Sequence, residues 1–140
     1  MPTLPEQFAE HPARIASKAS MEAIEAKNGE AWVALFAENA IVEDPIGPSM
    51  FDPEGKGHRG RAAIRAFYDD VIGPNDAIVF TIRESIACGS EVANIGTIST
   101  TLPGGGAIVH TDGVFTYRVN EANEVVALRA FWEMDRVRME

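Results

Sequence analysis

Cysteine, histidine and long hydrophobic runs are scarce in this sequence, and each scarcity excludes a class of protein. Cys88 is the only cysteine, so the chain cannot form an internal disulfide or a thiolate metal cluster. The three histidines lie far apart in the sequence, and we expect no metal site. No apolar stretch approaches the ~18 residues of a membrane helix, and Met1–Glu6 lacks the charged and apolar regions of a secretory signal. We therefore expect a soluble protein of the reducing cytoplasm.

Basic residues are also few, with 12 Lys and Arg against 21 Asp and Glu and a formal net charge of −9. The sequence has no run of basic residues, which disfavours nucleic acid and anionic membranes as partners. With 140 residues, of which 46% are hydrophobic, the chain is long enough to bury one core. We therefore expect residues 1–140 to form a single domain, either a compact enzyme or a binding module.

The first part of the sequence predicts helices. Residues 13–27 contain no Gly or Pro and repeat small apolar residues at helical spacing. Residues 30–37 indicate a second helix, which presents Trp32 and Phe36. A short apolar strand follows and ends at Asp44. A carboxylate is thus expected at the end of a strand, directly before a proline.

The remainder predicts a loop, one more helix and then strands. Residues 45–60 hold three Pro and four Gly and are expected to form a long loop. Residues 61–72 place apolar side chains at i, i+3, i+4, i+7 and i+8, which is helical spacing. After Asp76 the sequence indicates strands that are separated by turns at 103–106 and 120–123. Helices beside a meandering antiparallel sheet make an α+β domain.

Three segments carry a resemblance to a known family. They are Trp32–Gly47, which contains a Val-Glu-Asp-Pro run, Gly60–Tyr68 and Glu124–Trp132. Over roughly residues 15–135 the sequence resembles a ketosteroid isomerase-like member of the nuclear transport factor 2-like, or SnoaL-like, superfamily. The resemblance implies a cone-shaped fold in which a curved antiparallel or mixed sheet wraps around about three helices and encloses an apolar cavity. It also implies a homodimer, no cofactor and a hydrophobic ring-shaped ligand such as a steroid.

The resemblance assigns roles to individual residues. Moving the double bond of a β,γ-unsaturated ketone into conjugation needs a carboxylate base and donors to the dienolate oxygen. Asp44 matches the base of the family, and Tyr68 matches a tyrosine of its catalytic hydrogen-bond network. Trp132 matches an aromatic residue that lines the cavity, and Phe36 and Phe67 are further candidates to contact the ligand.

The sequence departs from the family at both principal donors. Ser20 stands where the family has its catalytic Tyr, and Phe115 stands where it has a protonated Asp. Asp112 is the nearest carboxylate, but its odd offset from Phe115 puts it on the other face of the strand unless Gly113 forms a bulge. Tyr117 shares the face of Phe115 and is a candidate for the missing phenol, although a packed core tyrosine is the more ordinary interpretation.

Several alternatives stay open at this point. Strand alternation alone does not separate Asp44 from Glu43 as the carboxylate inside the pocket, and an Asp before a Pro is often only a turn residue. Tyr68 on an apolar helix face also fits an ordinary core position. Ser49–Lys56 lengthens the loop after Asp44 and suggests a lid over a ligand, or simply a packed surface loop.

These observations support three hypotheses for the function. The first is a steroid delta-isomerase-like enzyme in which Asp44 shuttles the proton of a 3-ketosteroid or similar cyclic ketone. The second is a steroid- or lipid-binding protein that kept the cavity and lost the donors. The third is a polyketide cyclase or dehydratase-like enzyme with the same carboxylate base. Both an enzyme and a binding protein are thus consistent with the sequence.

Overall fold

The computed structural model describes residues 1–5, 8 and 10–140. It contains three α-helices, α1 (Pro12–Glu25), α2 (Gly29–Ala34) and α3 (Arg61–Phe67), together with a π-helical turn η1 (Tyr68–Ile72) and a 3₁₀ turn η2 (Met134–Arg136). The strands are β1 (Phe36–Glu43), β2 (His58–Arg59), β3 (Ala77–Cys88), β4 (Glu91–Thr101), β5 (Ile108–Val119), β6 (Val125–Phe131) and β7 (Arg138–Met139). None of the helices in the described part of the chain has the length and apolar character that crossing a membrane requires.

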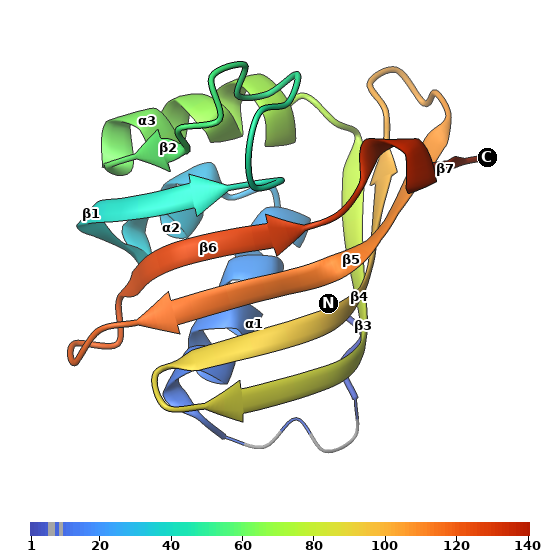
Figure 1. Ribbon diagram of the computed structural model, residues 1–140. Coiled ribbons are helices and arrows are strands. Elements are labelled where there is room, and N and C mark those ends of the chain that lie inside the picture. The colour runs from blue at the N-terminus through green and yellow to red at the C-terminus, as the bar shows by residue number, and fades with distance from the viewer. Residues whose placement is uncertain (6–7, 9) are drawn as a thin grey trace.

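The strands form one curved sheet in the order β2-β1-β6-β5-β4-β3, and β7 pairs with the start of β5. Among the strands named above, β1 and β6 pair in parallel and the other pairs are antiparallel, so the sheet is mixed. The helices lie on one side of it, with α1 behind β4, β5 and β6 and with α3 beyond β1 (Figure 1). We call the face toward the helices the inner face and the opposite one the outer face. The expected α+β fold with a curved mixed sheet is confirmed.

Helix α1 brings polar groups into the interior. His11 caps its first turn by accepting a hydrogen bond from the backbone N–H of Ala13, and Pro12 occupies the first helical position. The buried face consists of small and apolar residues: Ala13, Ala16, Ser17, Ser20, Met21, Ala23 and Ile24. Small side chains let the helix pack close to the sheet, so Ser17 and Ser20 have no exposed surface and need partners inside the protein.

The second helix is shorter than its apolar pattern predicts. It ends at Ala34, and Phe36 already pairs with Val125 in the sheet, so the prediction of a helix over residues 30–37 is wrong at its C-terminal end. The edge of Phe36 nevertheless contacts Trp32, with ring centroids 4.9 Å apart, and both side chains are fully buried. The aromatic contact therefore joins the end of α2 to the start of β1.

A bulge on β3 bends the sheet. The register moves from Ile82 opposite Gly96 to Glu84 opposite Ile95, which leaves Arg83 unpaired in the ladder. Gly96 is required here because a Cβ on it would collide with the carbonyl oxygen of Thr81. Gly113, by contrast, pairs regularly with Gly96. The bulge considered at Gly113 does not form.

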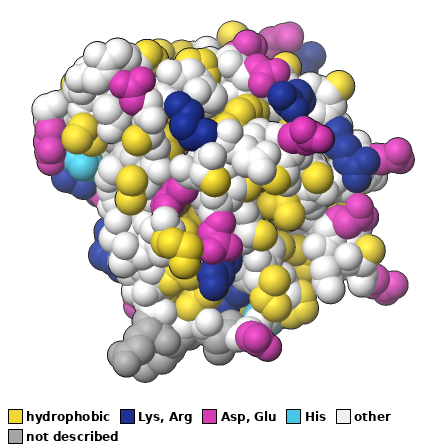
Figure 2. Space-filling view, turned by 180° about the vertical axis from the view of Figure 1, so that it is seen from behind, with side chains coloured by type: hydrophobic (Ala, Val, Ile, Leu, Met, Phe, Trp, Pro, Cys, Tyr) yellow, Lys and Arg dark blue, Asp and Glu magenta, His cyan; other side chains and the backbone are white. Residues whose placement is uncertain are grey.

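The core fills the space between the inner face of the sheet and the helices. Its largest fully buried side chains are Trp32, Phe36, Met21, Ile64, Val42, Val92 and Val125. The molecular surface seen from behind mixes acidic and basic side chains with scattered hydrophobic ones (Figure 2). The apolar residues gathered in this core surround the polar groups described next.

Candidate functional site

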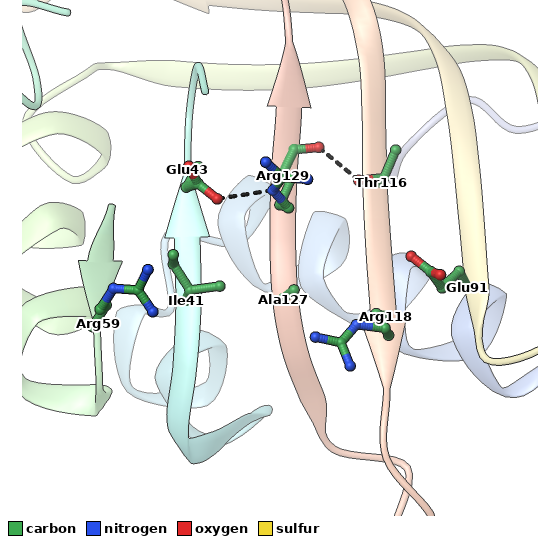
Figure 3. A pocket seen from close by; sticks show the side chains of 8 residues that line it. All are labelled: Ile41, Glu43, Arg59, Glu91, Thr116, Arg118, Ala127 and Arg129. Atoms are coloured by element: carbon green, nitrogen blue, oxygen red, sulfur yellow. Dashed lines mark hydrogen bonds and ion pairs between the residues drawn. The ribbon is translucent and has the colours of Figure 1, made fainter. Parts of the chain in front are cut away.

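The two carboxylates at the end of β1 point in opposite directions. Val42 is fully buried on the inner face, so Glu43 faces outward and Asp44 faces inward again. Glu43 accepts a hydrogen bond from Nε of Arg129 at 2.8 Å on the outer face (Figure 3). Asp44 Oδ1 instead accepts a hydrogen bond from Nε1 of Trp132 at 2.6 Å. The structure thus decides between the two residues and brings Asp44 and Trp132 together.

Glu43 belongs to a hollow of the outer face that is separate from Asp44. The hollow has a volume of about 330 Å³ and is lined by Ile41, Glu43, Arg59, Glu91, Thr116, Arg118, Ala127 and Arg129. Its side chains come from β2, β1, β6, β5 and β4 across the open face of the sheet (Figure 3). None of the site residues predicted from the sequence lines it.

The environment of Asp44 makes its carboxylate a stronger base. Burial raises the pKa of Asp44 above its ordinary value, while the hydrogen bond from Trp132 and the nearby His58 act in the opposite direction. The His58 ring lies on β2 opposite Val42 and packs against Phe67, with ring centroids 4.5 Å apart. Asp44 Oδ2 has no hydrogen-bond partner among the described residues, so one oxygen is anchored and the other is available to take a proton.

A second group of polar side chains connects α1 to the sheet. The Oγ of Ser20 lies 2.9 Å from the hydroxyl of Tyr117 on β5, and it accepts a hydrogen bond from Nε1 of Trp32 at 2.9 Å. Ser20 and Trp32 are fully buried and Tyr117 is 3% exposed. Burial raises the pKa of Tyr117, the bond to Ser20 counteracts this, and the charge of Asp44 raises it further. Tyr117 and Asp44 therefore interact within the same interior.

The remaining aromatic candidates line this interior without polar contacts of their own. Phe36, Phe67 and Phe115 are all buried, with Phe115 next to Ala130 of β6 on the inner face. Tyr68 is buried as well, and its ring packs against Gly29 and Trp32. Burial raises the pKa of Tyr68. Its hydroxyl makes no hydrogen bond to Asp44 or Tyr117 within the described structure, so the predicted network through Tyr68 is not seen.

The structure corrects the expectation for Asp112, which lies on the outer face. Because the register through Gly113 is regular, Asp112 pairs with Thr97 and its carboxylate accepts hydrogen bonds from the Thr97 hydroxyl at 2.5 Å and from Arg138 at 3.0 Å. These bonds, with that of Arg138 first, lower the pKa of Asp112. An ionised carboxylate has no proton to donate, so Asp112 is unsuited to the role of the protonated Asp.

Sequence reasoning misses two buried polar groups of the interior. The pattern around Trp32 predicts only packing, yet its indole N–H donates to Ser20. Asn94 has no exposed surface, and its Nδ2 donates to Ser17 Oγ at 3.1 Å while its Oδ1 has no partner among the described groups. Asn94 alternates in phase with Val92, which is the one signal that places it on the inner face. Within the described residues, no three His, Cys, Asp or Glu side chains gather to hold a metal ion.

Comparison with known proteins links this geometry to a family. A family model described as the SnoaL-like domain matches residues 18–134. The Δ5-3-ketosteroid isomerase from Mycobacterium sp. is 38% identical, with a TM-score of 0.88 over 94% of this chain and 100% of that protein. RV0760c from Mycobacterium tuberculosis is 35% identical, with a TM-score of 0.88 over 96% of this chain and 100% of that protein.

Two further solved structures contain or target steroids. RV0760c in complex with estradiol-17β-hemisuccinate is 36% identical, with a TM-score of 0.85 over 92% of this chain and 99% of that protein. A computationally designed 17-OHP binder is 34% identical, with a TM-score of 0.87 over 94% of this chain and 98% of that protein. The similarity in all these cases extends over nearly the whole chain.

Proposed function

Because the chain belongs to the SnoaL-like family, we propose that it isomerises a β,γ-unsaturated ketone of steroid-like shape, with Asp44 as the proton shuttle. The observation that carries this proposal is the hydrogen bond from Trp132, which anchors one oxygen of Asp44 and leaves the other without a partner among the described residues. A ketosteroid isomerase among its relatives supports the reaction. The relative in complex with estradiol-17β-hemisuccinate supports the class of ligand.

The proposed reaction moves one proton and needs no other reactant. Asp44 Oδ2 removes a proton from the carbon between the carbonyl and the double bond, and the electron pair moves into a dienolate. The protonated Asp44 then returns the proton to the γ-carbon, which restores the carbonyl and leaves the double bond in conjugation. The raised pKa of Asp44 favours the first step because it brings the basicity of the carboxylate closer to that of a useful general base.

Burial fits this chemistry as well. Phe67 and Phe115 are buried and Trp132 is half-buried. Aromatic side chains such as these suit the flat faces of a fused-ring ligand and the exclusion of water from a dienolate. The outer hollow is an unsuitable alternative for such a ligand, because three arginines and two glutamates surround it. We therefore favour the inner site over this outer hollow for an apolar ketone.

A ligand carrier is the competing function, and one observation favours it. Ser20 and Phe115 occupy the positions of the two donors that the family uses, and loss of one oxyanion donor costs about 10²-fold or more in rate. The experiment is to mix the purified protein with a Δ5-3-ketosteroid and follow the absorbance of the conjugated enone, while binding of a phenolic steroid is measured in parallel. Enone formation supports the isomerase, and tight binding without enone formation would instead establish the carrier.

We also propose that the protein forms a homodimer, as the resemblance implies. Several large hydrophobic side chains are exposed on the outer face of the sheet, among them Phe131 and Ile86, which are 50% and 59% exposed. Light scattering on the purified protein tests this directly. A mass of about twice 15.1 kDa supports the dimer, and the monomer mass contradicts it.

A further inference from the structure

The side chains of Trp32, Ser20 and Tyr117 form a buried polar chain between α1 and the sheet, and this chain has one more donor proton than it has hydrogen bonds. Trp32, Ser20 and Tyr117 contribute three donors, one indole N–H and two hydroxyls, and they form two hydrogen bonds with one another. Neither hydroxyl makes another hydrogen bond to a described residue. Whichever way the bond between Ser20 and Tyr117 runs, one hydroxyl proton is left without an acceptor in an interior where a free donor is costly.

We propose that this proton belongs to Tyr117 and donates to the carbonyl oxygen of the substrate, with Trp32 and Ser20 as the positioning residues behind it. Tyr117 would then supply from β5 the phenol that Ser20 no longer supplies from α1. This inference rests on the proposed function and names the oxyanion donor of the same site.

One of the two bonds in the chain has a fixed direction. An indole N–H only donates, so Ser20 Oγ is the acceptor toward Trp32. The hydroxyls of Ser20 and Tyr117 lie 2.9 Å apart and either can donate to the other, and the proposal takes Ser20 as the donor to Tyr117 Oη. In this direction each donor polarises the next, and the phenol at the end becomes a better donor than it would be alone.

The place of Tyr117 suits the proposed role. It lies on the inner face of β5, two residues beyond Phe115, and the charge of Asp44 affects its ionisation. In the proposed arrangement, a substrate whose α-carbon meets Asp44 has its carbonyl oxygen toward Tyr117. Because the pKa of Tyr117 is raised, the phenol stays protonated at neutral pH and stabilises the dienolate by a hydrogen bond rather than by giving up its proton.

Four variants separate this proposal from a purely structural role. Tyr117→Phe removes the hydroxyl and keeps the ring, and we expect kcat to fall by about 10²-fold with a much smaller change in KM. Ser20→Ala breaks the chain, and we expect kcat to fall by about 10-fold, with recovery in Ser20→Thr. Ser17→Ala is the matched control, because Ser17 is equally buried on the same face of α1 but bonds to Asn94 instead.

A second readout does not depend on turnover. A bound phenolic steroid carries its oxygen where the dienolate oxygen would lie, and its ionisation can be followed by ultraviolet absorbance as the pH is changed. The proposal predicts that the pKa of the bound phenol is lower in the wild type than in Tyr117→Phe, and that Ser20→Ala lies between them. Thermal unfolding of every variant verifies that it is folded at the assay temperature.

The outcomes are distinguishable from those of the proposed function. If the wild type shows no turnover but Tyr117→Phe shifts the ionisation of the bound phenol, the isomerase proposal fails and the donor assignment holds. If Tyr117→Phe folds and matches the wild type in both readouts, the donor assignment is wrong. If Ser20→Ala behaves like Ser17→Ala, the positioning role of Ser20 is wrong. Absence of both turnover and phenol binding would overturn both proposals.

Discussion

Trp132 Nε1 lies 2.6 Å from Asp44 Oδ1, and this contact is a consequence of the one parallel strand pair among the described strands of the sheet. Strands β1 and β6 run side by side with Glu43 opposite Arg129, so their C-terminal ends meet at the same edge. Asp44 directly follows Glu43, and Trp132 lies three residues after Arg129. A sheet made only of antiparallel neighbours would not bring these two segments together in this way.

Removal of this hydrogen bond should raise the pKa of Asp44 further. Burial raises the pKa of Asp44, and the hydrogen bond from Trp132 lowers it. Trp132→Phe keeps an aromatic ring but removes this bond, so the pKa of Asp44 rises. We expect the acid limb of the kcat/KM profile to move to higher pH by about one unit, as a hydrogen bond to a charged group of ~1.5 kcal/mol allows. A pH–rate profile measures the shift, and an unchanged acid limb would show that the bond does not tune the base.

Asp44→Asn should stabilise the protein at neutral pH. A carboxylate whose pKa is raised by folding binds its proton more tightly in the native state, so its ionisation above that pKa costs stability. We expect the melting temperature of the variant to exceed that of the wild type by a few degrees at pH 7, on the order of 3 °C per kcal/mol. The difference should shrink as the pH falls toward the ordinary value of 3.8. Thermal unfolding between pH 4 and pH 8 checks this, and a gap that widens toward acid pH contradicts it.

Asp112→Asn should leave turnover unchanged within about twofold, because Asp112 lies on the outer face and bonds to Thr97 and Arg138. The pKa of Asp112 is lowered in the folded protein, so any stability that it contributes is present at neutral pH and is lost as the pH falls through that lowered value. Steady-state kinetics on the variant are sufficient here. A drop in turnover by about tenfold or more would show that Asp112 reaches the substrate after all.

Gly96→Ala should destabilise the sheet by about 2 kcal/mol or more, because the new methyl group would meet the backbone of Thr81 at the bulge of β3. Gly106→Ala is the control, since Gly106 has only ordinary contacts at 3.6 Å and no positive φ. Urea unfolding of both variants gives the comparison. Equal midpoints for the two variants would mean that the strand shifts to accept the methyl group at little cost.

The alternation of β5 can be predicted from the sequence, whereas the bulge of β3 cannot. Phe115 and Tyr117 face inward and Asp112 faces outward, as a period of two requires. The bulge falls at Arg83 without a Gly or Pro in that strand, and its signal is Gly96 on the neighbouring strand, which the linear pattern does not connect to it. Glu84 consequently loses phase with Ile82 and is exposed.

The polar chain is equally hidden from the sequence. The helical pattern places Ser20 on an inward face, and the structure agrees, but its partners Trp32 and Tyr117 lie 12 and 97 residues away in the sequence. Both partners carry apolar rings that fit a core by pattern alone, and only the tertiary structure shows where their polar atoms meet. Similarly, α2 ends where Phe36 pairs with Val125 in the sheet. Helix periodicity does not predict this contact.

The most direct test of the central claim compares turnover of a Δ5-3-ketosteroid by the wild type, Asp44→Asn and Glu43→Gln. Glu43 is the adjacent carboxylate of the same strand end, but it lies on the outer face with Arg129, so its variant controls for the loss of one local charge. The account predicts that Asp44→Asn turns over on the order of 10²-fold or more slowly while binding of a phenolic steroid is retained, and that Glu43→Gln stays close to the wild type. Turnover by folded Asp44→Asn at the rate of the wild type would contradict the assignment of Asp44 as the proton shuttle.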